Sequence, residues 1–217
     1  MQTGFGDLRV RNDEVPIRLF KSDALEFFTH IHPGVVLAMY VPVVAVFLAG
    51  GIEERPAGTH VLPVLTTYAA GILLWSLVEY GLHRFLFHYE PKDARLQRVW
   101  YLIHGVHHEQ PQCKTRLLMP PILSVPLAFL FYGIFRGAVG GLLQAPLAVA
   151  PAFAGFVTGY LIYDMMHYAE HHLSMRRGPL KYLKRYHLLH HFKTPGCRFG
   201  VSSPLWDLVF GTRPPQS

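Results

Sequence analysis

Four long apolar runs without a single charged residue most constrain what this 217-residue chain can fold into. A bilayer core is crossed by about 20 consecutive apolar residues in an α-helix, and each run is of that order. A backbone that crosses lipid must satisfy its hydrogen bonds internally, which in a single apolar run means a helix. We therefore predict an all-α integral membrane protein with four transmembrane helices, at about 34–52, 61–82, 117–135 and 140–163.

The polar remainder falls into three segments, 1–33, 83–116 and 164–217, which an even number of spans places on one side. Eighteen of the twenty lysines and arginines lie in these segments; only Arg55 and Arg136 lie on the other side. Short loops rich in basic residues face the cytoplasm. We therefore expect one domain, 1–217, with both termini cytoplasmic, a cytoplasmic or interfacial segment at 1–33, and a cytoplasmic helical cap formed by 83–116 and 164–217.

The net charge of +6 suits either nucleic acid or anionic lipid headgroups. The apolar runs and the 51% hydrophobic content decide for membrane lipids as partners and against nucleic acid. The charged N-terminus lacks the early apolar stretch of a cleaved signal peptide. Cys113 and Cys197 form no CxxC motif, so neither a disulfide framework nor a zinc knuckle is indicated. The expected location is a bacterial inner membrane or, in a eukaryote, the endoplasmic reticulum.

Eleven of the fourteen histidines gather in four short clusters, HRFLFH, HGVHH, HYAEHH and HLLHH, each just beyond the cytoplasmic end of a span or in the cap. Imidazole is a common ligand for zinc, iron and copper, and it discriminates weakly between them. Eleven imidazoles are too many for one ion and suit two. The sequence therefore predicts a histidine-rich dimetal site in the cap, made by His83, His88, His104, His107, His108, His167, His171, His172, His187, His190 and His191.

Three adjacent histidine pairs predict how the two ions share these ligands. Neighbouring residues on a helix point about 100° apart, so both members of a pair cannot easily bind one ion from the same direction. We expect His107–His108, His171–His172 and His190–His191 each to be divided between the ions. The leading histidine of each cluster, at 104, 167 or 187, should join the pair member on its own face. His83 and His88, five apart, should serve both ions or close the ends of the site.

Four acidic residues beside the clusters, Glu79, Glu109, Asp164 and Glu170, are candidates to hold the far nitrogen of a ligating histidine. The sequence contains no Gly-rich phosphate loop, nucleophile elbow, HExxH motif, or flavin or haem module, so electrons must come from outside. A membrane zinc-binding protein or transporter is an alternative. A transporter, however, places polar ligands near mid-membrane, whereas these clusters lie at the ends of spans.

In these clusters the sequence resembles the fatty acid hydroxylase and sterol desaturase superfamily of membrane di-iron enzymes, with its HX3–4H, HX2–3HH and HX2–3HH boxes. It is most similar to the fatty acid 2-hydroxylases that act on sphingolipid acyl chains. The motifs that carry this likeness are WSLVEYGLHRFLFH, LIHGVHHEQP, RLLMPP, YDMMHYAEHH and YHLLHHF…FGVSSPLWDLVFGT. The likeness covers about residues 73–212, whereas 1–60 match only in being polar and then apolar.

The resemblance implies that the eleven clustered histidines bind two iron ions, which zinc can replace in purified protein. It implies that Tyr163 and Asp164 lie near the substrate as catalytic residues or behind the ligands. The co-substrate would be O2, and the lipid acyl chain would reach the site from the bilayer and be hydroxylated at C2 of a fatty acid or of a sphingolipid N-acyl chain. Desaturation, sterol methyl oxidation and carotenoid ring hydroxylation remain alternatives.

The electron donor is an expectation of its own. Yeast and animal members of this family usually carry an N-terminal cytochrome b5 domain, and the present sequence has none. We therefore expect a separate donor, either a cytochrome b5-like protein or a ferredoxin.

Overall fold

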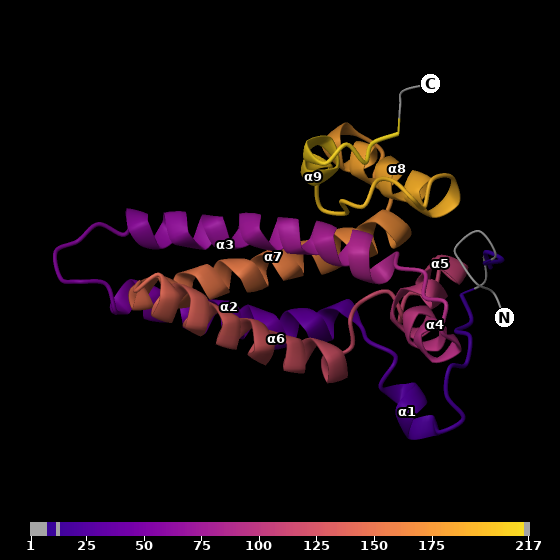
Figure 1. Ribbon diagram of the computed structural model, residues 1–217, viewed down its shortest axis with the longest axis horizontal. Coiled ribbons are helices and arrows are strands. Elements are labelled where there is room, and N and C mark those ends of the chain that lie inside the picture. Colours follow the sequence, from indigo (N-terminus) through magenta and orange to yellow (C-terminus); the bar gives the residue numbers. More distant parts are fainter. Residues whose placement is uncertain (1–7, 12–13, 215–217) are drawn as a thin grey trace.

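The computed structural model describes residues 8–11 and 14–214, and every regular element within them is helical. Four helices are long and apolar enough to cross a membrane: α2 (Pro33–Glu53), α3 (Leu62–Gly81) with its continuation η2 (Leu82–Phe87), α6 (Pro121–Phe135) with its continuation η4 (Arg136–Leu142), and α7 (Pro146–His172). They run alongside one another as an elongated bundle (Figure 1). The predicted all-helical membrane fold with histidine clusters is confirmed.

The bounds of three helices differ from those of the expected spans. The second continues as η2 to Phe87 rather than ending at about 82. The third helix begins at Pro121 rather than at 117, and the chain stays helical beyond 135, through Arg136, as the π-helix η4. Because η4 occupies 136–142, the fourth helix starts only at Pro146, a proline in the first turn where no N–H is needed. It then continues past 163 to His172, so the third histidine cluster belongs to the same helix.

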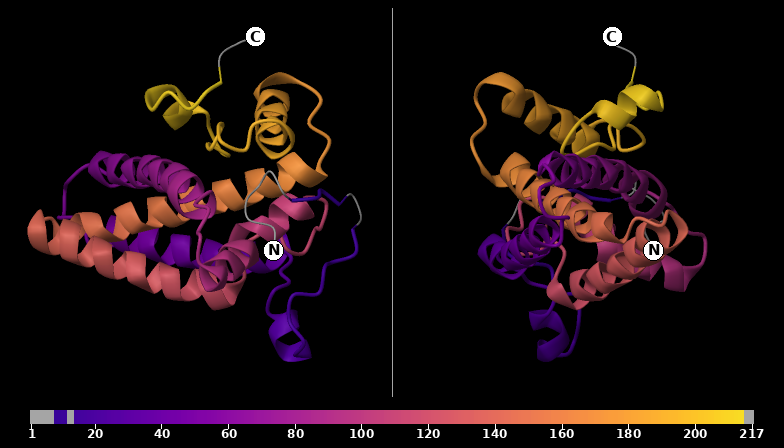
Figure 2. Two further views of the ribbon diagram at one scale, coloured as in Figure 1. Left: turned by 45° about the vertical axis from the view of Figure 1, so that its right-hand side comes forward. Right: turned by 90° about the vertical axis from the view of Figure 1, so that its left-hand side faces the viewer.

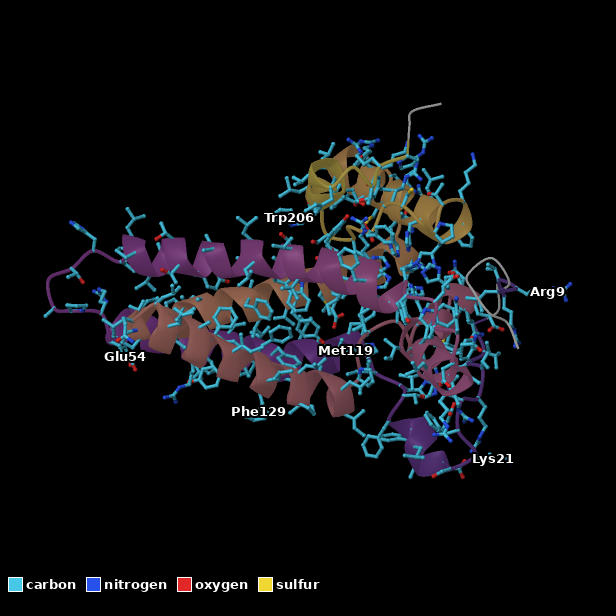
Figure 3. All side chains as sticks on the ribbon, viewed as in Figure 1. Arg9, Lys21, Glu54, Met119, Phe129 and Trp206 are labelled. Carbon is cyan, nitrogen blue, oxygen red and sulfur yellow. The ribbon has the colours of Figure 1, made fainter. Side chains whose placement is uncertain are left out.

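Helix α7 is the core of the bundle. In its most apolar window 61% of residues are buried, against 11–22% for the other three helices, whose side chains face outward instead. Phe129, 73% exposed, projects from α6 in this way (Figure 3). Inside, Trp75 of α3 packs edge-on against Phe156 and Tyr160 of α7. Such outward apolar surface suits lipid rather than water.

Glycines bring α3 and α7 into close contact. A Cβ added to Gly71 would lie 2.1 Å from the Ala152 carbonyl oxygen, and one added to Gly155 would lie 1.9 Å from that of Tyr68. A Cβ at Gly159 would collide with the Trp75 side chain at 2.5 Å. Small residues at helix interfaces are the usual means of close packing within a bilayer. This contact fixes the end of α7 that carries His167 and His171 against the end of α3.

The remaining helices form a cap at one end of the bundle (Figures 1 and 2). They are α4 (Ala94–Trp100), η3 (Tyr101–Gly105), α5 (Val106–Glu109), α8 (Gly178–Phe192) and α9 (Leu205–Val209). Helix α1 (Asp23–Phe27) stands apart from the bundle, beyond the end of α6 and beside α4 (Figure 1). The cap therefore combines helices that precede α6 in the sequence with helices that follow α7, and all of them lie at the same end of the spans.

Candidate metal centre

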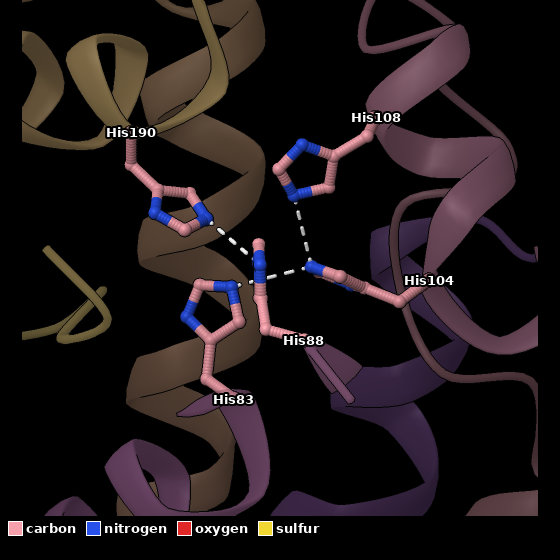
Figure 4. A group of neighbouring side chains, drawn as sticks. All are labelled: His83, His88, His104, His108 and His190. Atoms are coloured by element: carbon pink, nitrogen blue, oxygen red, sulfur yellow. Dashed lines mark hydrogen bonds between the residues drawn. The ribbon is translucent and has the colours of Figure 1, made fainter. Parts of the chain in front are cut away.

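Ten of the fourteen histidines form two separate groups of five at the junction of the bundle and the cap. The first cluster is His83, His88, His104, His108 and His190; the second cluster is His107, His167, His171, His187 and His191. Within each cluster, one ring nitrogen from every residue lies within 4.8 Å of all the others. Figure 4 shows the first cluster, with rings from η2, η3, α5 and α8 pointing toward one another.

The ring nitrogens converge in a way that hydrogen bonding alone does not explain. In the first cluster the Nε2 atoms of His83 and His104 are 3.2 Å apart, and those of His88 and His190 are 2.9 Å apart. In the second cluster the Nε2 atom of His107 lies 3.0 Å from both His167 and His191. Nitrogens that each lie 2.0–2.1 Å from a shared ion are themselves separated by about 3 Å. The spacing therefore fits five ligands around one cation in each cluster.

The histidines are held in the neutral form that binds metal. Burial lowers the pKa of His107 to about 3, and burial together with neighbouring imidazoles lowers the pKa of His187 and His191 well below its usual value. The pKa of His104 and His108 is lowered for the same reasons. A neutral imidazole offers its unprotonated nitrogen as a ligand.

Two backbone carbonyls fix the tautomer of the first cluster. The Nδ1 atom of His83 lies 2.5 Å from the Phe199 carbonyl oxygen, and that of His190 lies 2.6 Å from the Cys197 carbonyl oxygen. Since a carbonyl only accepts, Nδ1 carries the proton in each ring and Nε2 faces the cluster as an acceptor. A ligating histidine characteristically donates its other N–H in this way.

Two buried carboxylates hold the segment that supplies these carbonyls. Asp207, fully buried, accepts from the backbone N–H of Phe199 at 2.9 Å and of Gly200 at 2.8 Å. Glu79 accepts from the N–H groups of Val201 and Ser202 at 2.9 and 2.8 Å. Asp207 and the two carbonyls were not among the site residues expected from the sequence. The only signal was the quoted FGVSSPLWDLVFGT motif, which contains Asp207.

The other candidate carboxylates take different places. Glu170, fully buried, lies 3.9 Å from Nδ1 of His187 and is the nearest acid to a second-cluster ring. Glu109 instead accepts from the Tyr101 hydroxyl at 2.7 Å. Asp164 is 1% exposed, and its Oδ2 atom has no hydrogen-bond partner among the described residues. Of the four acids, Glu170 comes within 3.9 Å of an outer ring nitrogen, which is too long for a hydrogen bond, and neither of its carboxylate oxygens has a hydrogen-bond partner among the described residues.

The structure divides two of the three adjacent pairs between the clusters. His107 and His108 lie in different clusters, as do His190 and His191. The leading residues follow the expected grouping: His104 joins His108, His167 joins His171 and His187 joins His191. His172 lies in neither cluster; it is half-buried, packs on Tyr168 with ring centroids 4.7 Å apart, and its Nε2 atom has no partner.

The helix type explains why His83 and His88 fall into one cluster instead of two. The π-helix η2 closes with a hydrogen bond of 3.0 Å from the His88 N–H to the His83 carbonyl, five residues apart. In a π-turn, residues five apart lie above one another, whereas in an α-helix they diverge. The expectation that they diverge assumed α-helical geometry.

The three isolated histidines have other contacts. His30 hydrogen-bonds the Thr115 hydroxyl at 2.7 Å, and the His32 ring accepts from the Gly34 N–H at the start of α2. His60 is exposed in the loop before α3. All three lie outside the two clusters.

An apolar cavity of about 370 Å³ reaches both clusters. Its inner end is formed by His104 of the first cluster and His107 and His167 of the second, together with Tyr163 and Asp164. Its walls are mainly aliphatic and aromatic, from α1, α4, η3 and the start of α6. The cavity is therefore shaped for an apolar chain whose end lies beside the clustered histidines.

A second hollow, of about 300 Å³, approaches the first cluster from elsewhere in the cap. It is lined by Arg84, Phe85, His88, Glu90, Pro195, Gly196, Phe199 and Thr212. His88 is half-buried, whereas the other nine clustered histidines are fully buried. The first cluster can thus be approached through a hollow with polar lining residues, which is separate from the apolar cavity.

Fold and site together define a helical membrane protein with a two-cluster histidine site at the end of an apolar cavity. The fatty acid hydroxylase family model matches residues 68–212, two thirds of the chain, and this protein belongs to that family. The chain is 36% identical to a dihydroceramide fatty acyl 2-hydroxylase of Arabidopsis thaliana, covering 91% of this chain and 80% of that protein. It is 34% identical to the human fatty acid 2-hydroxylase, covering 93% of this chain and 58% of that one.

A solved structure supports the same conclusion. Full-length scs7p, of which only the hydroxylase domain is visible, superposes with a TM-score of 0.79 at 35% identity, covering 88% of this chain and 70% of that one. The resemblance read from the histidine motifs is thereby confirmed.

Proposed function

We propose that this protein hydroxylates a lipid acyl chain at C2, in a fatty acid or in the N-acyl chain of a sphingolipid. One observation carries the proposal: the apolar cavity ends at histidines from both clusters. An acyl chain in this cavity would lie beside histidines of both clusters. The relatives named above are fatty acid and dihydroceramide fatty acyl 2-hydroxylases, which supports C2 as the position.

The histidine clusters fit two iron ions, one in each, and zinc can occupy the same nitrogens in purified protein. Bound iron supplies, with O2 and electrons, an oxidant able to break a C–H bond, which no amino-acid side chain can do. The protein's own residues hold the metal ligands in place and orient the substrate. The carbonyls of Phe199 and Cys197 fix two of the rings, and the cavity walls exclude water from the reacting carbon.

Asp164 and Tyr163 are the residues we assign to the substrate. Both line the inner end of the cavity beside His167. The Oδ2 atom of Asp164 is buried and has no hydrogen-bond partner among the described residues, so it can accept a hydrogen bond from a donor on the substrate, such as an amide N–H next to the acyl carbonyl. Such a bond would hold C2, one carbon further along, near the clusters. His172 is not assigned to either ion.

Electrons come in this proposal from a separate donor, a cytochrome b5-like protein or a ferredoxin. The polar hollow at His88 supports it, because it brings a surface approach to the first cluster without crossing the acyl cavity. The basic side of the molecule, which carries these sites, is cytoplasmic by the positive-inside rule. The acyl chain reaches the cavity from the bilayer, in a bacterial inner membrane or the endoplasmic reticulum of a eukaryote.

The test is lipid mass spectrometry of host cells that lack 2-hydroxy acyl lipids. Cells that express the protein should gain 2-hydroxy fatty acids or 2-hydroxy N-acyl sphingolipids. Cells that express the His167→Ala variant at the same level should not. A new double bond or an oxidised sterol, with no 2-hydroxy product, would replace this proposal by another oxidation of the superfamily.

A further inference from the structure

The segment before the first span, residues 15–31, forms one wall of the acyl cavity. Leu19, Phe20, Leu25, Phe28 and Thr29 all line it, opposite residues of α4, η3 and the start of α6. This segment lies outside the residues that the family model matches, 68–212. Figures 1 and 2 show α1 standing away from the bundle.

Polar contacts fasten this segment to the loop after α5. The buried Gln110 side chain accepts from the Ile17 N–H at 3.0 Å and donates to the Val15 carbonyl at 2.5 Å, which imitates the pairing of a β-strand. Further along, the Ile31 N–H donates to the Thr115 carbonyl at 2.8 Å. The segment is therefore held at both ends by residues 110–115.

A buried ion pair fixes the middle of the segment. The Arg116 guanidinium, whose side chain is 4% exposed, donates to the Glu26 carboxylate and to the Ile17 carbonyl. The second oxygen of Glu26 accepts from the backbone N–H groups of Leu19 and Phe20 at 3.0 and 2.9 Å. A buried pair is favourable when its remaining atoms are also hydrogen-bonded. Both Glu26 oxygens and both terminal nitrogens of Arg116 are, whereas the Arg116 Nε atom has no partner among the described residues. These bonds close residues 19–26 into a loop and so fix the apolar side chains at its two ends.

The two neighbouring phenylalanines of this segment differ in their relation to the cavity. Phe28 lines the cavity and is 51% exposed, whereas Phe27 is 72% exposed and does not line it. Their rings touch edge-on, with centroids 5.6 Å apart. Phe27 is placed to contact lipid, and Phe28 to contact a chain inside the cavity.

We propose that residues 15–31 complete the acyl-binding site and that Phe28 sets which acyl chain lengths are accepted. The inference rests on the proposed function, since it concerns the substrate of the same site. The Arg116–Glu26 pair positions this wall and does not touch the reacting carbon. An apolar wall discriminates by fit, and one methylene gained or lost in such a pocket changes relative specificity roughly tenfold or more.

The experiment compares Phe28→Ala, Phe28→Trp and the matched control Phe27→Ala in lipid nanodiscs, with acyl substrates of graded length in competition. Phe28→Ala should shift the ratio of kcat/KM toward longer chains by roughly tenfold, and Phe28→Trp should shift it toward shorter ones. Phe27→Ala should leave this ratio of kcat/KM values within about twofold of that of the unchanged protein. Unchanged ratios in both Phe28 variants overturn the inference while 2-hydroxy product still forms.

A binding measurement separates this inference from the reaction itself. A lipid with a photoreactive group on its acyl chain, bound to metal-free protein, should label residues 19–29 as well as 99–123. Labelling confined to 99–123 would mean that α1 only anchors the protein at the membrane surface, and the inference would be wrong. Labelling of 19–29 in a protein that forms no 2-hydroxy lipid would leave the acyl site standing and remove the proposed reaction.

Discussion

His107 and His108 are neighbours in the chain, but their rings belong to different clusters. The Nε2 atom of His107 lies 3.0 Å from that of His191, and the Nε2 atom of His108 lies 3.1 Å from that of His104. One turn of α5 therefore contributes to both halves of the site. The same holds for His190 and His191 at the end of α8. Two short helices thus fix the position of one cluster relative to the other.

This division predicts metal loss from one cluster at a time. We expect His107→Ala and His108→Ala each to reduce the content from two ions per chain toward one, because each change removes one of five nitrogens from a single cluster. His172→Ala, which alters a histidine at the end of α7 that lies outside both clusters, should keep both ions. Metal analysis of the purified protein measures the number of ions per chain. An equal loss in His172→Ala would mean that His172 is a ligand as well as His171.

A second prediction concerns Asp207, which positions the carbonyls behind His83 and His190. Asp207→Asn places an NH2 group against one of the two backbone N–H donors, at Phe199 or Gly200. We expect metal affinity to fall by about 10–100-fold, the usual effect of disturbing the residues behind a ligand. Competition with a chelator measures the affinity. Glu53→Gln, at the far end of α2, is the control and should leave it unchanged.

A third prediction tests the two residues assigned to the substrate. Asp164→Asn should lower kcat/KM by roughly 10–100-fold, the value of one hydrogen bond to a charged group, with both ions retained. Tyr163→Phe should also lower kcat/KM with both ions retained. Tyr168→Phe, on the same helix but packed on His172, should change neither quantity. Loss of metal in Asp164→Asn would instead place Asp164 behind the ligands.

A fourth prediction concerns the close contact of α3 and α7. Gly155→Ala should destabilise the protein by about 1–3 kcal/mol, because the new methyl group would overlap the Tyr68 carbonyl. Gly50→Ala is the matched control, a helical glycine with no atom within 4 Å of an added Cβ. It should be neutral or stabilising by up to about 1 kcal/mol. Thermal unfolding in one detergent compares the two; similar midpoints would contradict the packing argument.

The last prediction addresses sidedness. Cys197, half-buried in the cap, should react with a membrane-impermeant thiol reagent only from the cytoplasmic face, whereas a Glu54→Cys variant should react only from the other face. Labelling of intact and of inverted membrane vesicles distinguishes the two. Modification of Cys197 from the periplasmic or lumenal face would overturn the orientation.

The sequence by itself determined the number and nature of the spans and the composition of the site. Uncharged runs of this length have one stable backbone form in lipid, so α2, α3, α6 and α7 follow from hydropathy alone. Clustered histidines at helical spacing predict a metal site, because residues three and four apart lie on the same face of a helix. The family resemblance rested on the same motifs and was confirmed.

The tertiary structure decided which nitrogens meet. Local spacing assumes α-helical geometry, but η2 is a π-helix and places His83 and His88 in one cluster. Nor does spacing reveal which histidines from other segments surround a given ring, and within the described part of the chain no cluster forms around His172. The roles of Asp207, the Phe199 carbonyl and Phe28 depend on contacts between segments far apart in the chain. Such contacts are set by packing of the whole cap against the bundle, and no local pattern in the sequence encodes them.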